Sequence, residues 1–225
     1  MTDVTEPRRM SRYETIADYP ADAGAIVLTI GNFDGVHRGH HALLDRARRL
    51  AAPDAARVVA MTFEPHPISI LRPEAAPPRL TTAEYKLALL ERAGADDVIV
   101  LASRPELFAI SAHEFFERYI ATLRPLAIVE GPTFRFGHNR DGTIERLREL
   151  AASHNIRAEI VDEVVCPELP SRPVINSSTI RRALQEGRVE HANIKLGRPH
   201  RIAGVVGHGA ARGREIGFPT ANVEN

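Results

Sequence analysis

The stretch Leu28-Thr-Ile-Gly-Asn-Phe-Asp-Gly-Val-His-Arg-Gly-His40 decides the fold of this chain. It runs from a short apolar segment, through a turn punctuated by glycines, into an amphipathic helix expected over His37–Ala51. In open α/β sheets a strand, a glycine-containing turn and a helix in this order bind phosphate, because the helix start offers free backbone N–H groups. A parallel sheet with a phosphate site at its edge is therefore expected.

The rest of the chain repeats this alternation. Short apolar runs and amphipathic stretches follow one another from residue 25 to residue 165, which predicts a parallel sheet flanked by helices. The strands are expected at Ile26–Ile30, Val58–Phe63, Val98–Leu101, Ala127–Glu130 and Ala158–Val165. The helices are expected at His37–Ala51, Thr82–Ala93, Ser111–Leu123 and Thr143–His154. The fold class that follows is α/β.

Two regions interrupt the alternation. Glu64–Leu80 carries five prolines, so a loop that borders the sheet is expected there. After Gly187 a short helical stretch ends near Gly197, and glycine-rich sequence of β character follows. We therefore expect one domain over residues 1–187 and, over residues 188–225, a linker with the beginning of a second domain.

The composition limits the classes of function. Basic and acidic residues each number 29, so no net positive field gathers nucleic acid. Cys166 is the single cysteine, which excludes an internal disulfide and favours the reducing cytoplasm. No apolar stretch is long enough to span a bilayer, and Met1–Glu14 lacks the apolar core of a secretion signal, so no membrane partner is expected.

His37 and His40 are the first candidate catalytic residues. They lie three positions apart at the helix start, so both imidazoles can donate to oxygens of one polyphosphate. Three other interpretations compete with this one. The glycines can serve packing alone, His37 and His41 have the spacing of zinc ligands, and His40 can be a core histidine with satisfied hydrogen bonds.

The string Thr29–His40 closely resembles the opening motif of the prokaryotic bifunctional riboflavin kinase/FAD synthetases, which belong to the nucleotidylyltransferase superfamily marked by His-x-Gly-His. The resemblance implies a Rossmann-like nucleotidylyltransferase sheet, followed by an incomplete β-barrel segment. It also implies ATP and FMN as substrates, FAD as product, and Mg²⁺ bridging the phosphates. The turn residues that it assigns to nucleotide binding are Gly31, Asn32, Phe33, Asp34, Gly35 and Gly39.

Two further segments carry the resemblance. Met61-Thr-Phe-Glu-Pro-His-Pro67 resembles the family's second motif, and its Phe63 and His66 are candidates to face a flavin ring, although a mere connecting loop remains an alternative. Val129-Glu-Gly-Pro-Thr-Phe-Arg-Phe-Gly137 resembles the family's Gly-x-Asp/Asn-Phe-x-Phe-Gly stretch, with Arg135 as a candidate phosphate ligand. The alternative there is a surface turn. Thr133 departs from the family pattern, because it stands where an acidic or amide residue is usual.

Ile175-Asn-Ser-Ser-Thr-Ile-Arg-Arg-Ala-Leu184 predicts a second helix start, with hydroxyl residues near its cap. Arginine close to a helix start opposes the helix dipole, which favours a bound anion as the partner of Arg181. The stretch resembles the superfamily's second phosphate motif, with Asn176 in place of the first serine. Ser177, Ser178 and Arg181 are therefore candidate catalytic residues, and this helix start is expected to face the one at His37 across a polyphosphate.

Residues 196–222 resemble the entry to the riboflavin kinase domain, in which Thr220 and Asn222 would help to bind magnesium-ATP. The family's catalytic glutamate would lie beyond Asn225, so this chain alone is expected to lack riboflavin kinase activity. The expected function is FMN adenylyltransferase. Two alternatives stay open: a sister nucleotidylyltransferase with another phosphorylated acceptor, and a flavin or nucleotide sensor whose catalysis has decayed.

Overall fold

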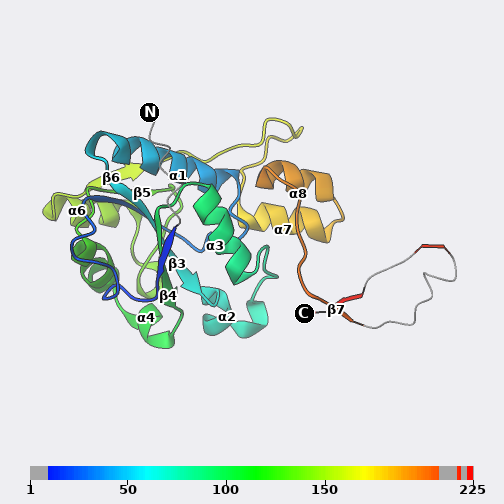
Figure 1. The fold of residues 1–225 in the computed structure, drawn as a ribbon, viewed down its shortest axis with the longest axis horizontal. Helices are drawn as coiled ribbons and strands as arrows, with labels where there is room; N and C mark the ends of the chain where they lie inside the picture. Colours follow the sequence, from blue (N-terminus) through cyan, green and yellow to red (C-terminus); the bar gives the residue numbers. More distant parts are fainter. Residues whose placement is uncertain (1–9, 208–216, 219–221, 225) are drawn as a thin grey trace, which may run out of the picture.

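A computed structural model describes residues 10–207, 217–218 and 222–224. Its centre is one six-stranded sheet, in which every pair of neighbouring strands is parallel and the order is β1-β4-β3-β2-β5-β6 (Figure 1). The strands are β1 (Ser11–Tyr13), β2 (Ile26–Ile30), β3 (Arg57–Glu64), β4 (Asp97–Ala102), β5 (Ala127–Glu130) and β6 (Arg157–Ile160). The predicted α/β fold class is confirmed.

Helices cover both faces of this sheet. Alternate residues of a strand point to opposite faces, and the strands β2, β3, β4 and β5 are apolar on both. One face packs on α1 (Arg38–Ala51) and α3 (Ala83–Arg92). The other packs on α5 (Ala112–Phe115), the π-helical turn η3 (Phe116–Ile120) and α6 (Ile144–Ser153). The result is a three-layer domain.

The strand order reverses at β2. The chain passes from β2 through β3 to β4 on one side, and then returns to place β5 on the other side of β2. In an open α/β sheet, ligands bind beyond the carboxyl ends of the strands at such a switch point. The turn after β2, which carries the quoted motif, lies there.

Several element boundaries differ from the sequence predictions. The segment expected to be loop throughout contains the helix α2 (Pro67–Leu71) and the 3₁₀ turn η2 (Pro73–Ala75), because proline is tolerated in the first turn of a helix. The helix expected over Ser111–Leu123 ends as a regular helix at Phe115 and continues through η3 and the 3₁₀ turn η4 (Ala121–Leu123). The last predicted strand ends at Ile160. Further short elements are α4 (Pro105–Ala109), η1 (Ala52–Asp54) and η5 (His138–Arg140).

After the sheet, α7 (Ser177–Gln185) and α8 (Val189–Leu196) pack side by side (Figure 1). They share a buried apolar cluster with the end of the proline-rich segment, made of Leu80, Ile180, Ala183, Ala192 and Leu196. Farther along, β7 (Val205–Gly207) pairs with β8 (Asn222–Glu224) in an antiparallel ladder. Within the described ranges, no helix has both the length and the apolar character that crossing a bilayer requires.

Candidate active site

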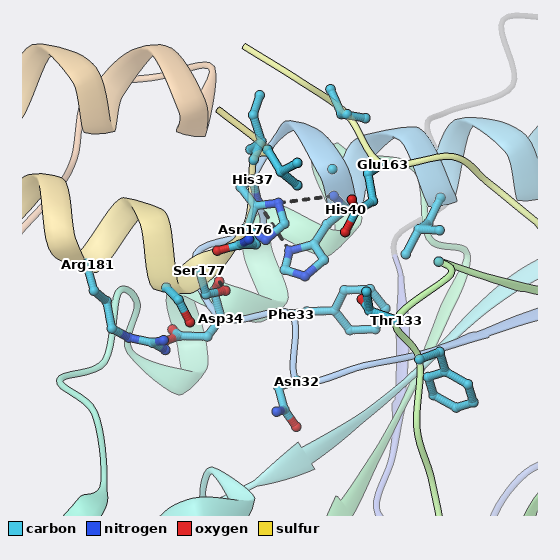
Figure 2. Close-up of a pocket in the computed structure, with 18 of the residues that line it drawn as sticks. Asn32, Phe33, Asp34, His37, His40, Thr133, Glu163, Asn176, Ser177 and Arg181 are labelled. Carbon is cyan, nitrogen blue, oxygen red and sulfur yellow. Dashed lines mark hydrogen bonds and ion pairs between the residues drawn. The ribbon is translucent and has the colours of Figure 1, made fainter. Parts of the chain in front are cut away.

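A cavity of about 750 Å³ opens at the switch point of the sheet. Five parts of the chain line it: the turn after β2 with the start of α1, the proline-rich segment after β3, the segment after β5, the segment after β6, and the start of α7. Figure 2 shows His37 and His40 beside Asn176 and Ser177, with Thr133 across from them. The structure thus brings the two predicted helix starts to one cavity.

At the start of α1, His37 and His40 cap each other. The backbone N–H of His40 donates to Nδ1 of His37, and the backbone N–H of His37 donates to Nδ1 of His40, both over 3.3 Å. The two rings stack with centroids 3.6 Å apart. Because each Nδ1 accepts a hydrogen bond, each neutral ring carries its proton on Nε2. Both imidazoles are therefore held as Nε2–H donors.

Both histidines are also held in the neutral form. Burial, together with the charge of His41, lowers the pKa of His37 to about 4. Burial lowers the pKa of His40 well below its ordinary value, and the neighbouring His37 lowers it further. A protonated ring carries a proton on Nδ1, so it could no longer accept the hydrogen bond of the cap. The capping geometry therefore also requires neutral rings.

The turn that precedes His37 is strained. Phe33, Gly35 and Val36 all have positive φ angles, of 47°, 86° and 34°. Val36 is the unusual one, because a β-branched residue rarely adopts this region, and such strain costs about 1–3 kcal/mol. Phe33 is fully buried under the cavity and meets the His40 ring edge to face at 5.1 Å. Surrounding contacts must hold this turn in place.

At the start of α7, Asn176 and Thr179 form a second reciprocal capping box. The Asn176 departure from the family motif therefore keeps a good helix cap. The two helix starts also touch each other: the hydroxyl of Ser177 donates to the backbone carbonyl of Asp34 over 2.8 Å. Gly39 lies so close that a Cβ there would be 3.2 Å from the carbonyl oxygen of Ile175.

The two capping boxes leave backbone donors for a ligand at both helix starts. The first N–H groups of a helix have no intrahelical acceptor. Here the caps take those of His40 and Thr179, whereas Gly39 and Ser178, one position earlier in their helices, line the cavity. Both helix dipoles add positive potential at the same place. Both helix starts can thus donate hydrogen bonds to an anion in this cavity.

Asp34 joins three parts of the site instead of facing it as a free carboxylate. Its side chain is 6% exposed and accepts hydrogen bonds from the backbone N–H groups of Leu80 and Thr81 over 3.0 to 3.2 Å. It also pairs with the guanidinium of Arg181, which in turn donates to the carbonyl of Pro78 over 2.7 Å. The anion inferred for Arg181 from the helix dipole is therefore present within the protein.

Glu130 is a site residue that the sequence reasoning missed. The ladder between β2 and β5 pairs Val27 with Ala127 and Leu28 with Ile128. Two residues farther, the Glu130 side chain accepts the N–H of Ile30 over 2.7 Å. The side chain is 1% exposed and lines the cavity, and burial raises its pKa well above the ordinary value. The carboxyl of Glu130 thus completes the ladder where the two strands end.

Lys86 of α3 was missed as well. Its ammonium group is buried and lies 3.1 Å from the carbonyl of Phe63, 3.2 Å from the hydroxyl of Thr62 and 3.0 Å from the carboxylate of Glu64. It ties α3 to the end of β3. Only tertiary structure reveals this role, because a lysine on an amphipathic helix is usually solvated.

The structure separates the other predicted residues into two groups. Those that line the cavity are Asn32, Phe33, Asp34, Gly39, His66, Thr133, Ser177, Ser178 and Arg181. Four others lie outside its lining: Gly31, Gly35, Phe63 and Arg135. Gly35 serves close packing, because a Cβ there would stand 2.9 Å from the Leu80 side chain. Arg135 is exposed and donates a hydrogen bond to the carbonyl of Phe134. Asn222 begins β8, away from the cavity. Thr220 lies outside the described residues.

The fold and this site define an α/β protein of the nucleotidylyltransferase type, in which a His-x-Gly-His helix start and a second helix start share one cavity. The chain belongs to the FAD synthetase family, which it matches over residues 19–171. Residues 196–225 match the riboflavin kinase family. The resemblance found in the sequence is confirmed.

Relatives carry the same pair of names. The bifunctional riboflavin kinase/FMN adenylyltransferases of Escherichia coli K12 and Pseudomonas fluorescens are 37% and 38% identical to this chain over 88% of its length. The chain spans 62% of the length of these relatives. A crystal structure described as a macrolide-efflux protein of Streptococcus pneumoniae is 30% identical, with a TM-score of 0.81 over 96% of this chain and 68% of that one.

Proposed function

We propose that this chain joins FMN to the AMP portion of ATP, forming FAD and diphosphate. The observation that carries the proposal is the meeting of two helix N-termini at one cavity, each with a reciprocal cap and a backbone N–H left over. Membership of the FAD synthetase family supports FMN as the acceptor.

The reaction needs alignment and charge stabilisation, and no covalent nucleophile. An oxygen of the FMN phosphate forms a bond to the α-phosphorus of ATP, while the bond from that phosphorus to the bridging oxygen breaks and diphosphate leaves with the electron pair. Negative charge builds on the phosphate oxygens. The Nε2–H groups of His37 and His40 and the N–H groups of Gly39 and Ser178 are the donors that this charge meets.

Neutral histidines suit this task, because their donors need no proton exchange during the reaction. A donor that is fixed before the reaction costs no reorganisation when charge develops. The capping box supplies this fixation, since rotation of either ring about its χ angles breaks a hydrogen bond of the helix start. His66, Ile68, Pro77 and Pro78 also line the cavity, and the prolines make this part of the lining stiff, which suits a flat ring.

Mg²⁺ fits this site as a companion of the triphosphate. Within the described residues, no three His, Cys, Asp or Glu side chains gather as a metal site. Mg²⁺ is often held by substrate phosphates with one or two carboxylates, and Asp162 and Glu163 are exposed carboxylates on the cavity lining. When bound, the ion would offset phosphate charge.

The domain division stays a prediction. The boundary expected at residue 187 falls between α7 and α8, and the packing of α8 on α7 favours a first domain that includes both helices. The antiparallel pair of β7 and β8 fits the expected beginning of a β domain. The cytoplasmic location expected from the single cysteine also stays a prediction.

The test is to incubate the 225-residue chain with FMN, ATP and Mg²⁺ and to measure FAD and diphosphate together. We expect the two products in equal amounts. Diphosphate formed only with a different phosphorylated acceptor would favour a sister transferase. Tight binding of FMN or ATP without any product would favour a sensor, and either result would contradict the proposal.

A further inference from the structure

Arg198 reaches from the segment after α8 into the turn that precedes His37. Its guanidinium donates to the carbonyl of Gly35 over 2.5 Å and to the carbonyl of Val36 over 3.0 Å. It donates to Leu196 as well, over 3.3 Å, and lies 5.8 Å from the centre of the Tyr85 ring on α3. One side chain therefore connects α3, the end of α8 and the catalytic turn.

The two carbonyls that Arg198 contacts belong to the strained part of the turn. Gly35 and Val36 both have positive φ angles, and Val36 immediately precedes the cap residue His37. Because the two residues are adjacent in the chain, any change in the backbone angles of Val36 moves His37. A planar guanidinium can bind two neighbouring carbonyls at once, which fixes their relative orientation.

Other contacts hold different atoms of the same turn. The N–H of Gly35 donates to the hydroxyl of Thr81, and the Asp34 carboxylate is tied to Leu80, Thr81 and Arg181. Arg198 binds the backbone carbonyls of Gly35 and Val36. Both the N–H group and the carbonyls of the turn are thus held by hydrogen bonds.

We propose that Arg198 is a positioning residue for FAD formation, which fixes the turn so that His37 and His40 present their Nε2–H groups to the phosphates. This inference rests on the proposed function. It also couples the two parts of the chain, since Arg198 lies in the segment that matches the riboflavin kinase family, whereas the turn lies in the segment that matches FAD synthetase.

Arg201 offers a matched control. It is an arginine three residues farther along, exposed, and its guanidinium lies 4.9 Å from the centre of the same Tyr85 ring. Its contact with Tyr85 resembles that of Arg198, but the turn carbonyls are held by Arg198. Arg198→Met and Arg201→Met therefore remove the same charge next to the same ring, and only the first releases the turn.

The experiment compares both variants with the wild-type chain in steady-state FAD formation and in hydrogen exchange of the peptide covering residues 33–41. For Arg198→Met we expect kcat to fall about 10- to 100-fold, as small misplacements of catalytic groups do, with the KM for FMN nearly unchanged. Exchange in this peptide should become faster. Arg198→Lys should be intermediate, because one ammonium cannot hold two carbonyls in a fixed plane.

Arg201→Met should match the wild type in both measurements. Wild-type kcat and wild-type exchange in Arg198→Met would overturn the proposal, as would equal losses in the two Met variants. If Arg198→Met fails to fold, the same comparison is made with Arg198→Lys. Failure of the wild type to make FAD would refute the proposed function alone, since the exchange measurement still decides whether Arg198 fixes the turn.

Discussion

Replacing Glu130 with glutamine should stabilise the protein at neutral pH. Burial raises the pKa of Glu130, so the folded chain keeps a proton that the unfolded chain releases above its ordinary carboxyl pKa. Wild-type stability therefore falls as the pH rises through this window, by at most about 1.4 kcal/mol per pH unit while Glu130 stays protonated. Glutamine offers Ile30 an acceptor of the same kind and has no proton to lose.

The measurement is urea unfolding of the wild type and Glu130→Gln at about pH 5.5, 6.5 and 7.5. The free energy of unfolding of the variant should exceed that of the wild type by a difference that grows with pH. Glu149→Gln on the exposed side of α6 makes the same chemical change away from the cavity and is the control for the substitution itself. Glu130→Ala should be less stable than Glu130→Gln by about 1–3 kcal/mol at every pH, because neither variant titrates at this position and alanine leaves the N–H of Ile30 without a partner.

Parallel pH profiles for the wild type and Glu130→Gln would refute this reasoning. They would mean that Glu130 is ionised in the folded protein, and that water or a cation in the cavity compensates its negative charge. A lower stability of Glu130→Gln at pH 7 would lead to the same conclusion.

Three further predictions concern the helix starts. His37→Asn keeps a good helix cap, so its melting temperature should stay close to that of the wild type. It removes the imidazole donor, so turnover should fall roughly 10²- to 10³-fold. A turnover rate near that of the wild type would refute the role of His37. Because the pKa of His37 lies at about 4 in the folded chain, the unfolded chain binds more protons between that pH and the ordinary histidine value of 6.5. Lowering the pH through this window should therefore reduce the unfolding free energy of the wild type by about 3 kcal/mol relative to that of His37→Asn. The same dependence of unfolding free energy on pH in both proteins would contradict this prediction. Gly39→Ala should weaken ATP binding about tenfold, as measured by calorimetry. The new Cβ would stand 3.1 Å from the His37 ring and 3.2 Å from the Ile175 carbonyl oxygen, and would so push the helix starts apart. Unchanged affinity would show that the spacing of the helix starts is not critical.

Much of the sheet could be predicted from local pattern. The bounds of β2 and β5 coincide with the predicted runs Ile26–Ile30 and Ala127–Glu130, because each is a short, mostly apolar run that ends at a turn former. β1, a three-residue edge strand of sequence Ser-Arg-Tyr, has no such run. It forms because it pairs with β4, and this contact is 86 residues away in sequence (97 minus 11 for the pair Ser11 and Asp97).

The candidate site could be predicted as two motifs but not as a network. Local sequence placed His37, His40 and Ser177 at helix starts, since caps and glycines are local signals. The partners of Arg181 and of Arg198 depend on contacts 147 and 163 residues apart. The raised pKa of Glu130 depends on burial, which the sequence at the end of a strand does not reveal. Such pairings follow from the packing of whole elements.

The central claim is that one triphosphate is held by both helix starts. It is tested most directly by a ¹H–¹⁵N NMR titration with Mg²⁺ and an ATP analogue that carries a methylene group between the α and β phosphorus atoms, so that no diphosphate can leave. The backbone amides of Gly39 and Ser178 should shift together, with one dissociation constant. A shift at only one of the two amides, or two unrelated constants, would contradict the claim.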